Sequence, residues 1–356
     1  MFLKIKNRII SEKKKPLIVF EISANHQKSK SKIYKLINEA KKIGAEAIKF
    51  QTFRTDEMTI NSGYKDFVIK SKFKNKSWNN RSLFSLYKQA QFPFEWHKDI
   101  FDYAKKKKLI CFSSVFDQYS LDFLERLNCP AYKIASLESL HYPLIKKVCE
   151  TNKPLIISTG TLSLKEIDEL IKFLKKNKKN NFAILHCVTE YPASYKNLNL
   201  KTINYLKKKY KCIVGFSDHS IGIGASIASI SYGANIIEKH YKLKNQKNSL
   251  DTSFSASSDE MKLLLKETEN AWLSLGVVKT KTLKSEKIYR KFIRSIYSFH
   301  DIKKGELFTK KNIKVIRPGN GLMPKYFEKL LGKKSPININ KNRPLNKKIL
   351  KRLKIT

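Results

Sequence analysis

The stretch Ala45–Thr52, with the sequence AEAIKFQT, is a largely apolar run that ends in polar residues, and seven other stretches share this character. These are Leu17–Ser23, Leu109–Ser114, Ala131–Ser136, Pro154–Thr159, Phe182–Cys187, Cys212–Asp218 and Asn235–His240. Between them lie segments such as residues 33–43, where apolar residues recur with the period of an amphipathic helix. Nearly continuous apolar strands that alternate with helices predict a parallel sheet covered by helices. Eight such units predict a closed (β/α)8 barrel, the TIM-barrel class of α/β fold.

A doubly wound open sheet is the alternative fold for such a pattern. That fold usually places a glycine-rich phosphate-binding turn directly after its first strand. Residues 21–31, which follow the first predicted strand, contain no glycine. The sequence therefore favours the barrel.

The pattern also predicts how the chain divides into domains. We expect the barrel to span residues 1–279, and the polar, charged residues 280–291 to form a linker. Residues 292–356 consist of short alternating stretches separated by turn signals, which predicts a small β-rich domain. A long segment between the second and third predicted strands, residues 53–93, is rich in aromatic residues that include Phe73 and Trp78. We expect this segment to lie over the mouth of the barrel, where loops carry function.

The net charge of the chain is high. Its 356 residues include 73 Lys and Arg against 30 Asp and Glu, which gives a formal charge of +43. Nucleic-acid-binding proteins are often this basic, but these lysines are spread along the whole chain, which favours a solvated surface. The five cysteines form no close pair, which argues against a thiolate zinc site and suits a cytoplasmic location. There is no apolar run of about 18 residues, so we expect no membrane span.

Polar residues follow most of the predicted strands. The carboxyl ends of the strands of a parallel barrel meet at one mouth, so these polar groups are expected to share one site. Because alternate side chains of a strand share a face, three pairs are expected to point the same way: Lys49 with Gln51, Ser217 with His219, and Glu238 with His240.

Two lysines, Lys49 and Lys133, lie within apolar strands. A buried ammonium group needs an anionic partner, because an isolated buried charge is costly. Together with the hydroxyl groups of nearby strand ends, the two lysines predict a cradle for a phosphate and a carboxylate. Those hydroxyl groups belong to Ser114, Ser136, Ser158 and Ser217. Salt bridges to structural carboxylates are the alternative role for both lysines.

His219 and His240 end two neighbouring strands and are expected to face one lumen. Two imidazoles with oxygen ligands suit a divalent metal, Mn²⁺ first, with Zn²⁺, Co²⁺ or Mg²⁺ as alternatives. The nearby carboxylates are those of Glu21, Glu238 and Asp251. A metal with an open position can polarise a substrate carbonyl. His186 and Cys187 are adjacent on one strand, so they should point to opposite faces, which disfavours a Cys–His nucleophile pair.

Seven motifs resemble, in order along the chain, the hallmarks of the sialic acid synthase family. They are Glu21–His26, Ile48–Thr52, Ala131–Ser136, Ser158–Gly160, Gly215–His219, Glu238–His240 and Arg317–Gly321. The resemblance implies a (β/α)8 barrel followed by a SAF (antifreeze-like) domain, which caps the partner's active site in a domain-exchanged homodimer. It also implies metal-dependent condensation of phosphoenolpyruvate with an N-acylated amino sugar, giving a nonulosonic acid and phosphate.

Within the family, three segments resemble the pseudaminic acid synthase branch most: Ser82–Lys88, Phe94–Lys98 and Leu250–Ser255. This branch implies 2,4-diacetamido-2,4,6-trideoxy-L-altrose as the sugar. His186 fits the neuraminate-type branches better, so N-acetylneuraminate or legionaminate synthesis is the alternative. A carbohydrate-binding protein and a nucleic-acid-binding barrel are the non-enzymatic alternatives.

The matching motifs also imply a role for each site residue. Phosphoenolpyruvate would be bound by Lys49, Ser114, Lys133, Ser136, Ser158 and Ser217, and the metal by His219 and His240. The sugar would be contacted by Gln51, Tyr191, Asp251 and, from the SAF domain of the other subunit, Arg317. The catalytic groups would be Lys49, Lys133 and two carboxylates, with Glu138 expected to assist the attacking water and Glu21 as the alternative.

Overall fold

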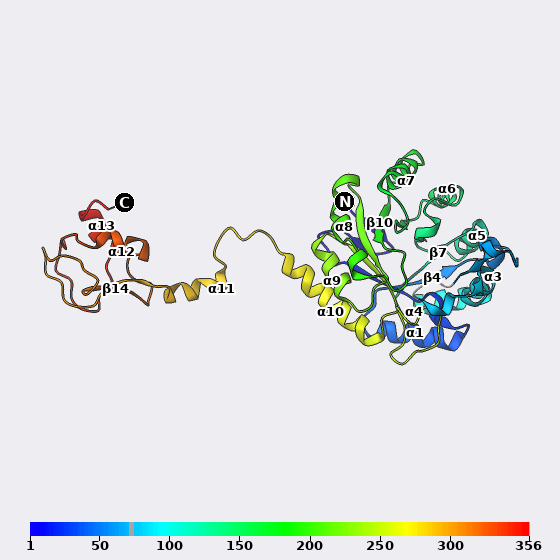
Figure 1. Ribbon diagram of the computed structural model, residues 1–356, viewed down its shortest axis with the longest axis horizontal. Coiled ribbons are helices and arrows are strands. Elements are labelled where there is room, and N and C mark those ends of the chain that lie inside the picture. The colour runs from blue at the N-terminus through cyan, green and yellow to red at the C-terminus, as the bar shows by residue number, and fades with distance from the viewer. Residues whose placement is uncertain (71–74, 356) are drawn as a thin grey trace. The chain divides into compact units, whose positions relative to one another are not determined.

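The structure is a computed structural model that describes residues 1–70 and 75–355, so Phe73 of the aromatic segment lies outside the described residues. The chain forms two compact units, Met1–Gly276 and Val277–Thr356. Figure 1 shows both units, and each is described by itself below.

Eight parallel strands of the first unit close into a barrel, so the predicted fold is confirmed. In chain order they are β3 (Leu17–Glu21), β4 (Ala47–Thr52), β7 (Ile110–Val115), β8 (Tyr132–Ile134), β9 (Leu155–Ser158), β10 (Phe182–Cys187), β11 (Ile213–Asp218) and β12 (Ile236–His240). Each strand pairs with the strands next to it in this order, and β12 pairs with β3 to complete the ring. All eight predicted strands are therefore present.

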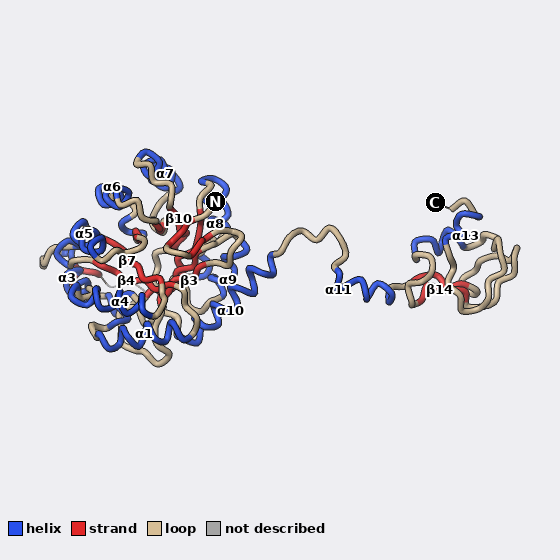
Figure 2. The backbone as a smooth tube through the Cα atoms, turned by 180° about the vertical axis from the view of Figure 1, so that it is seen from behind, coloured by secondary structure: helices blue, strands red, loops and turns tan. Residues whose placement is uncertain are grey.

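Helices surround the barrel, as Figure 2 shows for the first unit. They are α1 (Lys30–Lys42), α4 (His97–Lys106), α5 (Gln118–Arg126), α6 (Tyr142–Glu150), α7 (Leu164–Lys176), α8 (Lys201–Tyr210), α9 (Gly224–Ser231) and α10 (Ser258–Leu275).

Helix α7 illustrates how sequence determines these helices. It begins with a capping box, in which Ser163 and Glu166 satisfy each other's backbone N–H groups. Apolar residues at positions 167, 170, 171 and 174 form one buried stripe against the barrel. Burial of each such side chain contributes about 1.5–3 kcal/mol.

The two ends of the barrel differ. A hairpin of β1 (Leu3–Ile5) and β2 (Arg8–Ile10) packs its apolar side chains into the barrel core. Arg8 Nε donates a hydrogen bond of 2.8 Å to Glu46, just before β4, so the hairpin lies at the amino ends of the strands. The carboxyl ends of the strands therefore form the mouth of the barrel.

The aromatic segment lies at this mouth, as expected. It contains α2 (Thr55–Met58), a short antiparallel pair of β5 (Val68–Ile69) and β6 (Arg81–Ser82), and α3 (Leu83–Ala90). Asn75 Nδ2 and Trp78 Nε1 both donate hydrogen bonds to the carbonyl of Leu250, in the loop that follows β12. These bonds fix the segment beside the carboxyl end of β12.

The second unit is small and built around one antiparallel pair, β13 (Ser295–Ser298) and β14 (Ile313–Ile316). Its core includes Ile296, Phe308 and Leu345, and α12 (Phe327–Leu330) and α13 (Lys347–Arg352) pack beside it. The predicted linker, residues 280–291, contains α11 (Lys284–Lys287) and most of a 3₁₀ turn, η7 (Ile288–Phe292). No helix in the described part of the chain has the length and apolar content needed to cross a bilayer.

Candidate active site

Side chains from five separate strands meet inside the barrel. Lys49 of β4 contacts Glu21 of β3, donates to Ser114 Oγ of β7 at 2.8 Å, and lies 3.6 Å from Glu238 of β12. Lys133 Nζ of β8 lies 3.3 Å from the same Glu238 oxygen. Because β8 and β12 are not neighbours in the ring, this contact crosses the lumen. The predicted convergence at the strand ends is therefore present in the structure.

Both lysines and both glutamates in this lumen cluster are almost fully buried. Burial alone would lower the pKa of Lys49, but Glu21 and Glu238 outweigh burial and raise it. Burial would raise the pKa of Glu238, but Lys133 and Lys49 outweigh it and lower this pKa. The pKa of Glu21 is raised by its burial in spite of Lys49, and that of Lys133 is lowered by its burial. Glu238 is thus the main anion of the cluster.

Four predicted serines lie around this cluster. Ser217 Oγ donates weakly to Glu238 at 3.4 Å, and Ser136 Oγ accepts a hydrogen bond of 3.0 Å from the backbone N–H of Gly160. Ser158 Oγ is buried and has no hydrogen-bond partner among the described residues, and the same holds for Thr189 Oγ1. Two buried hydroxyl groups without protein partners are free to bind a water molecule or a ligand oxygen.

Gly160 allows these hydroxyl groups to approach each other. A Cβ atom at this position would collide with the Thr189 hydroxyl and would lie 2.8 Å from Ser136 Oγ. Only glycine fits here without displacing the side chains around it.

The two predicted metal-binding histidines also lie together, with ring centroids 5.5 Å apart. His219 Nδ1 lies 3.0 Å from the carbonyl oxygen of Val188, which can only accept, so in the neutral ring the proton is on Nδ1 and Nε2 carries a free lone pair. His240 Nδ1 is buried without a hydrogen-bond partner in the described part of the chain, and Asp251 Oδ2 lies 3.8 Å away.

These two imidazoles fit a divalent metal, although no third protein ligand joins them in the part of the chain that the structure describes. Within residues 1–70 and 75–355, no group of three or more His, Cys, Asp or Glu side chains is arranged to hold a metal ion. The expected carboxylate ligands Glu21 and Glu238 are paired with lysines instead. Burial and His219 lower the pKa of His240 well below its usual range, so His240 is a neutral imidazole. Water or substrate oxygens would have to supply the remaining ligands.

An aromatic wall encloses the histidines. The Tyr191 ring lies 4.2 Å from His219, and also 5.1 Å from both Trp78 and Phe254, measured between ring centroids. Phe254 in turn lies 4.9 Å from His240. The wall joins the aromatic segment to the loop after β12, and it gives the mouth an apolar side.

Two polar residues that are predicted to contact the sugar form hydrogen bonds with their neighbours. Gln51 Nε2 donates to Glu21 Oε1 at 3.3 Å. Asp251 Oδ2 accepts a hydrogen bond of 3.2 Å from the backbone N–H of Ala24. Arg317 lies in the second unit, so its predicted contact with the sugar stays a prediction.

Glu138 ends the short turn η5 (Ser136–Glu138) that follows β8. Its Oε2 atom is buried and has no partner among the residues that the structure describes. Burial raises the pKa of this carboxyl from 4.5 to about 7, even though Lys133 opposes the rise. A carboxyl with this pKa can both accept and release a proton near neutral pH.

Two features of the site escaped the sequence analysis. Cys187 is buried, and its sulfur lies 3.8 Å from Nδ1 of His219, a contact that the sequence analysis did not predict. Glu238 was expected beside a metal, whereas it is the shared partner of Lys49 and Lys133. The position of Glu238, on the same face as His240, was the signal for its inward orientation.

Comparisons with known proteins identify the family of the chain. The chain matches the NeuB family over residues 36–280 and the SAF domain over residues 293–350. It is 40% identical over 326 residues to a pseudaminic acid synthase of Campylobacter jejuni, with 92% of this chain and 94% of that protein covered. An N,N'-diacetyllegionaminic acid synthase of Campylobacter jejuni is 35% identical, with 90% and 96% covered. The crystal structure of an N-acetylneuraminic acid synthetase from Leptospira borgpetersenii has a TM-score of 0.71 at 30% identity, with 81% of this chain and 95% of that chain covered.

These matches span both units and most of the chain, so the predicted resemblance is confirmed. The two relatives named above are synthases that this chain matches over at least 90% of its length, which supports an enzyme rather than a non-catalytic binding protein. The chain therefore belongs to the NeuB family and is an enzyme of nonulosonic acid synthesis, of the pseudaminic acid synthase kind.

Proposed function

We propose that the protein condenses phosphoenolpyruvate with an open-chain acetamido sugar and water, giving a nonulosonic acid and phosphate. One observation carries this proposal. Two buried lysines, and two buried hydroxyl groups that have no partner among the described residues, lie in the same barrel mouth as two imidazoles. A phosphate, a carboxylate and a carbonyl group are the chemistry that such a set accommodates.

The buried lysines would hold phosphoenolpyruvate. Lys49 and Lys133 are already placed by Glu21 and Glu238, so little side-chain freedom is lost when an anionic substrate binds. Ser158 and Thr189 would donate hydroxyl hydrogen bonds to the phosphate, with Gly160 allowing the close approach. This binding would fix C3 of phosphoenolpyruvate as the nucleophile.

A divalent metal, Mn²⁺ first with Mg²⁺ or Co²⁺ as alternatives, held by His219 and His240, would supply Lewis-acid polarisation of the sugar aldehyde. The protein itself would orient the sugar through the polar groups of Gln51 and Asp251 and through the ring of Tyr191. The aromatic wall would exclude water from the reacting carbonyl carbon.

Bond formation between C3 and the aldehyde carbon uses the C2=C3 π electrons of phosphoenolpyruvate and turns the aldehyde oxygen into an alkoxide, which takes up a proton. It leaves an electron-deficient C2, which water then attacks. Glu138 would accept the proton of that water, because its buried Oε2 atom has no hydrogen-bond partner among the described residues and its pKa lies near 7. Phosphate then leaves from C2 by cleavage of the C–O bond. Glu21 is less suited to this role, since Lys49 contacts its carboxylate.

We propose 2,4-diacetamido-2,4,6-trideoxy-L-altrose as the sugar. The 40% identity to a pseudaminic acid synthase, against 35% to a legionaminic acid synthase of the same organism, supports this choice. The test is phosphate release from phosphoenolpyruvate with purified protein, Mn²⁺, and either this sugar or N-acetylmannosamine. Faster turnover of N-acetylmannosamine would show that the enzyme is a neuraminate synthase instead. Sugar binding without phosphate release would contradict the proposed condensation.

We also propose a homodimer in which the SAF domain of one subunit covers the barrel mouth of the other. Apolar side chains on loops at the carboxyl ends of the strands are exposed to solvent, among them Leu137 (66%), Tyr195 (60%) and Ile221 (56%). Mixing an Arg317→Ala variant with a His219→Ala variant tests the arrangement, because mixed dimers would regain one intact site. Absence of complementation in a mixture shown to form mixed dimers would argue against exchange.

A further inference from the structure

An ion pair lies on the outer side of the barrel wall, directly behind the two histidines. Asp218 is the last residue of β11 and Lys239 is the penultimate residue of β12. Lys239 Nζ lies 2.9 Å from Asp218 Oδ2, and both side chains are completely buried. The proposed chemistry above uses neither residue.

The pair is hydrogen-bonded to the structure around it. Asp218 Oδ1 accepts from the backbone N–H and the hydroxyl of Ser220, at 2.8 and 2.6 Å, and Oδ2 also accepts from Ser226 Oγ of α9 at 2.5 Å. Lys239 Nζ donates to the carbonyl of Ser220 at 2.8 Å. One ion pair therefore connects β11, β12, α9 and the loop that carries His219.

The register of the two strands explains why this position matters. Ser217 pairs with Glu238 on the inner face, and Asp218 pairs with Lys239 on the outer face. His219 follows Asp218 and His240 follows Lys239, so both histidines point inward again, and their ring centroids lie 5.5 Å apart. A slip of one residue between the strands would turn every side chain of β12 to the other face of the wall.

An ion pair is an unusual choice for this packed layer if stability is its only role. Buried ion pairs seldom stabilise a fold more than apolar residues of the same volume, because both charges must be desolvated. They do penalise any arrangement that separates the partners, since a lone buried charge is costly. A slipped register would leave both Asp218 and Lys239 without their partner.

We infer that the Asp218–Lys239 pair is a positioning device that fixes the distance and orientation of His219 and His240 for the metal they bind. The inference rests on the proposed metal-dependent function. The two residues act through the strand ends and touch no substrate. Outer groups that orient metal-binding histidines typically change metal affinity about 10- to 100-fold when they are removed.

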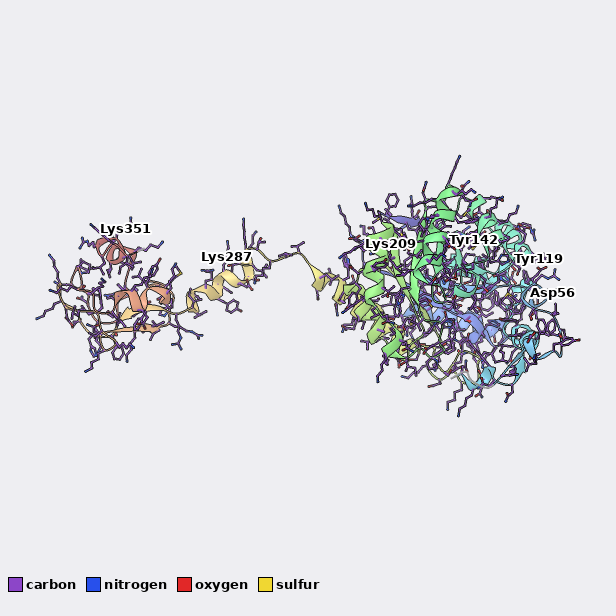
Figure 3. The ribbon with its side chains drawn as sticks, turned by 45° about the horizontal axis from the view of Figure 1, so that its top comes forward. Asp56, Tyr119, Tyr142, Lys209, Lys287 and Lys351 are labelled. Carbon is purple, nitrogen blue, oxygen red and sulfur yellow. The ribbon has the colours of Figure 1, made fainter. Side chains whose placement is uncertain are left out.

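The test compares Lys239→Met, Asp218→Asn and the double variant with the wild-type protein. Mn²⁺ binding to the substrate-free protein is measured by electron paramagnetic resonance, and folding by circular dichroism. The matched control is Lys209→Met, which removes an ion pair of 2.8 Å with Asp168 on the outer helices, where Figure 3 labels Lys209. Ser226→Ala, which removes one hydrogen bond to Asp218, is the milder variant should the others not fold.

We expect each single substitution to weaken Mn²⁺ binding at least tenfold, and the double variant to bind no more weakly than the worse single one. Lys209→Met should bind as the wild type does, and saturating Mn²⁺ should restore most of kcat in the variants. Folded variants with Mn²⁺ affinity within twofold of the wild type would overturn the inference.

A second measurement separates this inference from the proposed function. If the wild-type protein bound no Mn²⁺, the metal part of the proposed function would fail. Imidazole ¹H–¹⁵N spectra would then still test positioning: we expect the His219 and His240 signals to shift in Lys239→Met and to stay in Lys209→Met. Unchanged signals in Lys239→Met would refute the inference.

Discussion

Replacing Glu138 by Gln should remove activity and at the same time stabilise the barrel at alkaline pH. The carboxyl is raised from its ordinary pKa of 4.5 to about 7 by burial, so the folded protein holds this proton more tightly than the unfolded chain. Stability from this group is therefore complete below pH 4.5 and is lost as the pH rises through about 7. Each tenfold change in proton affinity corresponds to about 1.36 kcal/mol, so ionisation of Glu138 costs the folded state about 3 kcal/mol at pH 8.

Glutamine has the same shape and never ionises, so Glu138→Gln should avoid this cost. We expect the variant to be more stable than the wild type by about 3 kcal/mol at pH 8, and this advantage to shrink toward pH 5. It cannot accept a proton from the attacking water, so kcat should fall by about 10²- to 10⁴-fold. This loss corresponds to about 3–5 kcal/mol of barrier.

The assay is urea unfolding followed by tryptophan fluorescence in metal-free buffer at pH 5 and pH 8. All three tryptophans, Trp78, Trp96 and Trp272, lie in the first unit, so the signal reports on the barrel and not on the second unit. Glu95→Gln, at an exposed position, is the control. A stability difference that is equal at both pH values, or a variant with more than a tenth of wild-type kcat, would refute the reasoning about Glu138.

Three other predictions concern the phosphate cradle and the histidines. Lys133→Met should raise KM for phosphoenolpyruvate at least tenfold, because a charge-assisted contact worth about 1.5–3 kcal/mol is lost; an unchanged KM in steady-state kinetics would contradict the cradle. Gly160→Ala should lower both Tm and the affinity for phosphoenolpyruvate, since its methyl group would displace the Thr189 hydroxyl; a wild-type Tm by differential scanning calorimetry would show that the close packing is unimportant. Mn²⁺ binding should weaken from pH 8 to pH 6. Burial lowers the pKa of His219, but the charge of the nearby Cys187 sulfur and its hydrogen bond to the ring together have the larger effect and raise it, and a protonated imidazole cannot bind a metal. A Mn²⁺ affinity that is independent of pH over this range would exclude His219 as a ligand.

The sequence was sufficient to predict the barrel and the meeting of its strand ends. Side chains alternate between the two faces of a strand, and this rule predicted that Lys49 of β4 and His240 of β12 point into the barrel. The structure confirms both orientations. The alternation of side chains could not show which carboxylate each lysine contacts. The contact between Lys133 and Glu238, for example, crosses the lumen between two strands that do not pair with each other.

Loop geometry was the other limit of the sequence analysis. Trp78 reaches Tyr191 only because hydrogen bonds anchor its segment to Leu250, about 170 residues later in the chain. Such contacts leave no periodic signal in the sequence. The predicted roles of Arg317 and of the homodimer depend on a second subunit, so they stay predictions.

The contact between Lys133 and Glu238 also bears on the order in which a ribosome completes the enzyme. Lys133 emerges early, and the carboxylate that pairs with it follows 105 residues later on β12, which is also the strand that closes the ring. A nascent chain without β12 would have to hold this ammonium group in an open, wet sheet. Because Glu238 and His240 both lie on β12, the lysine can gain this partner, and the second histidine its place, only after β12 has joined the ring.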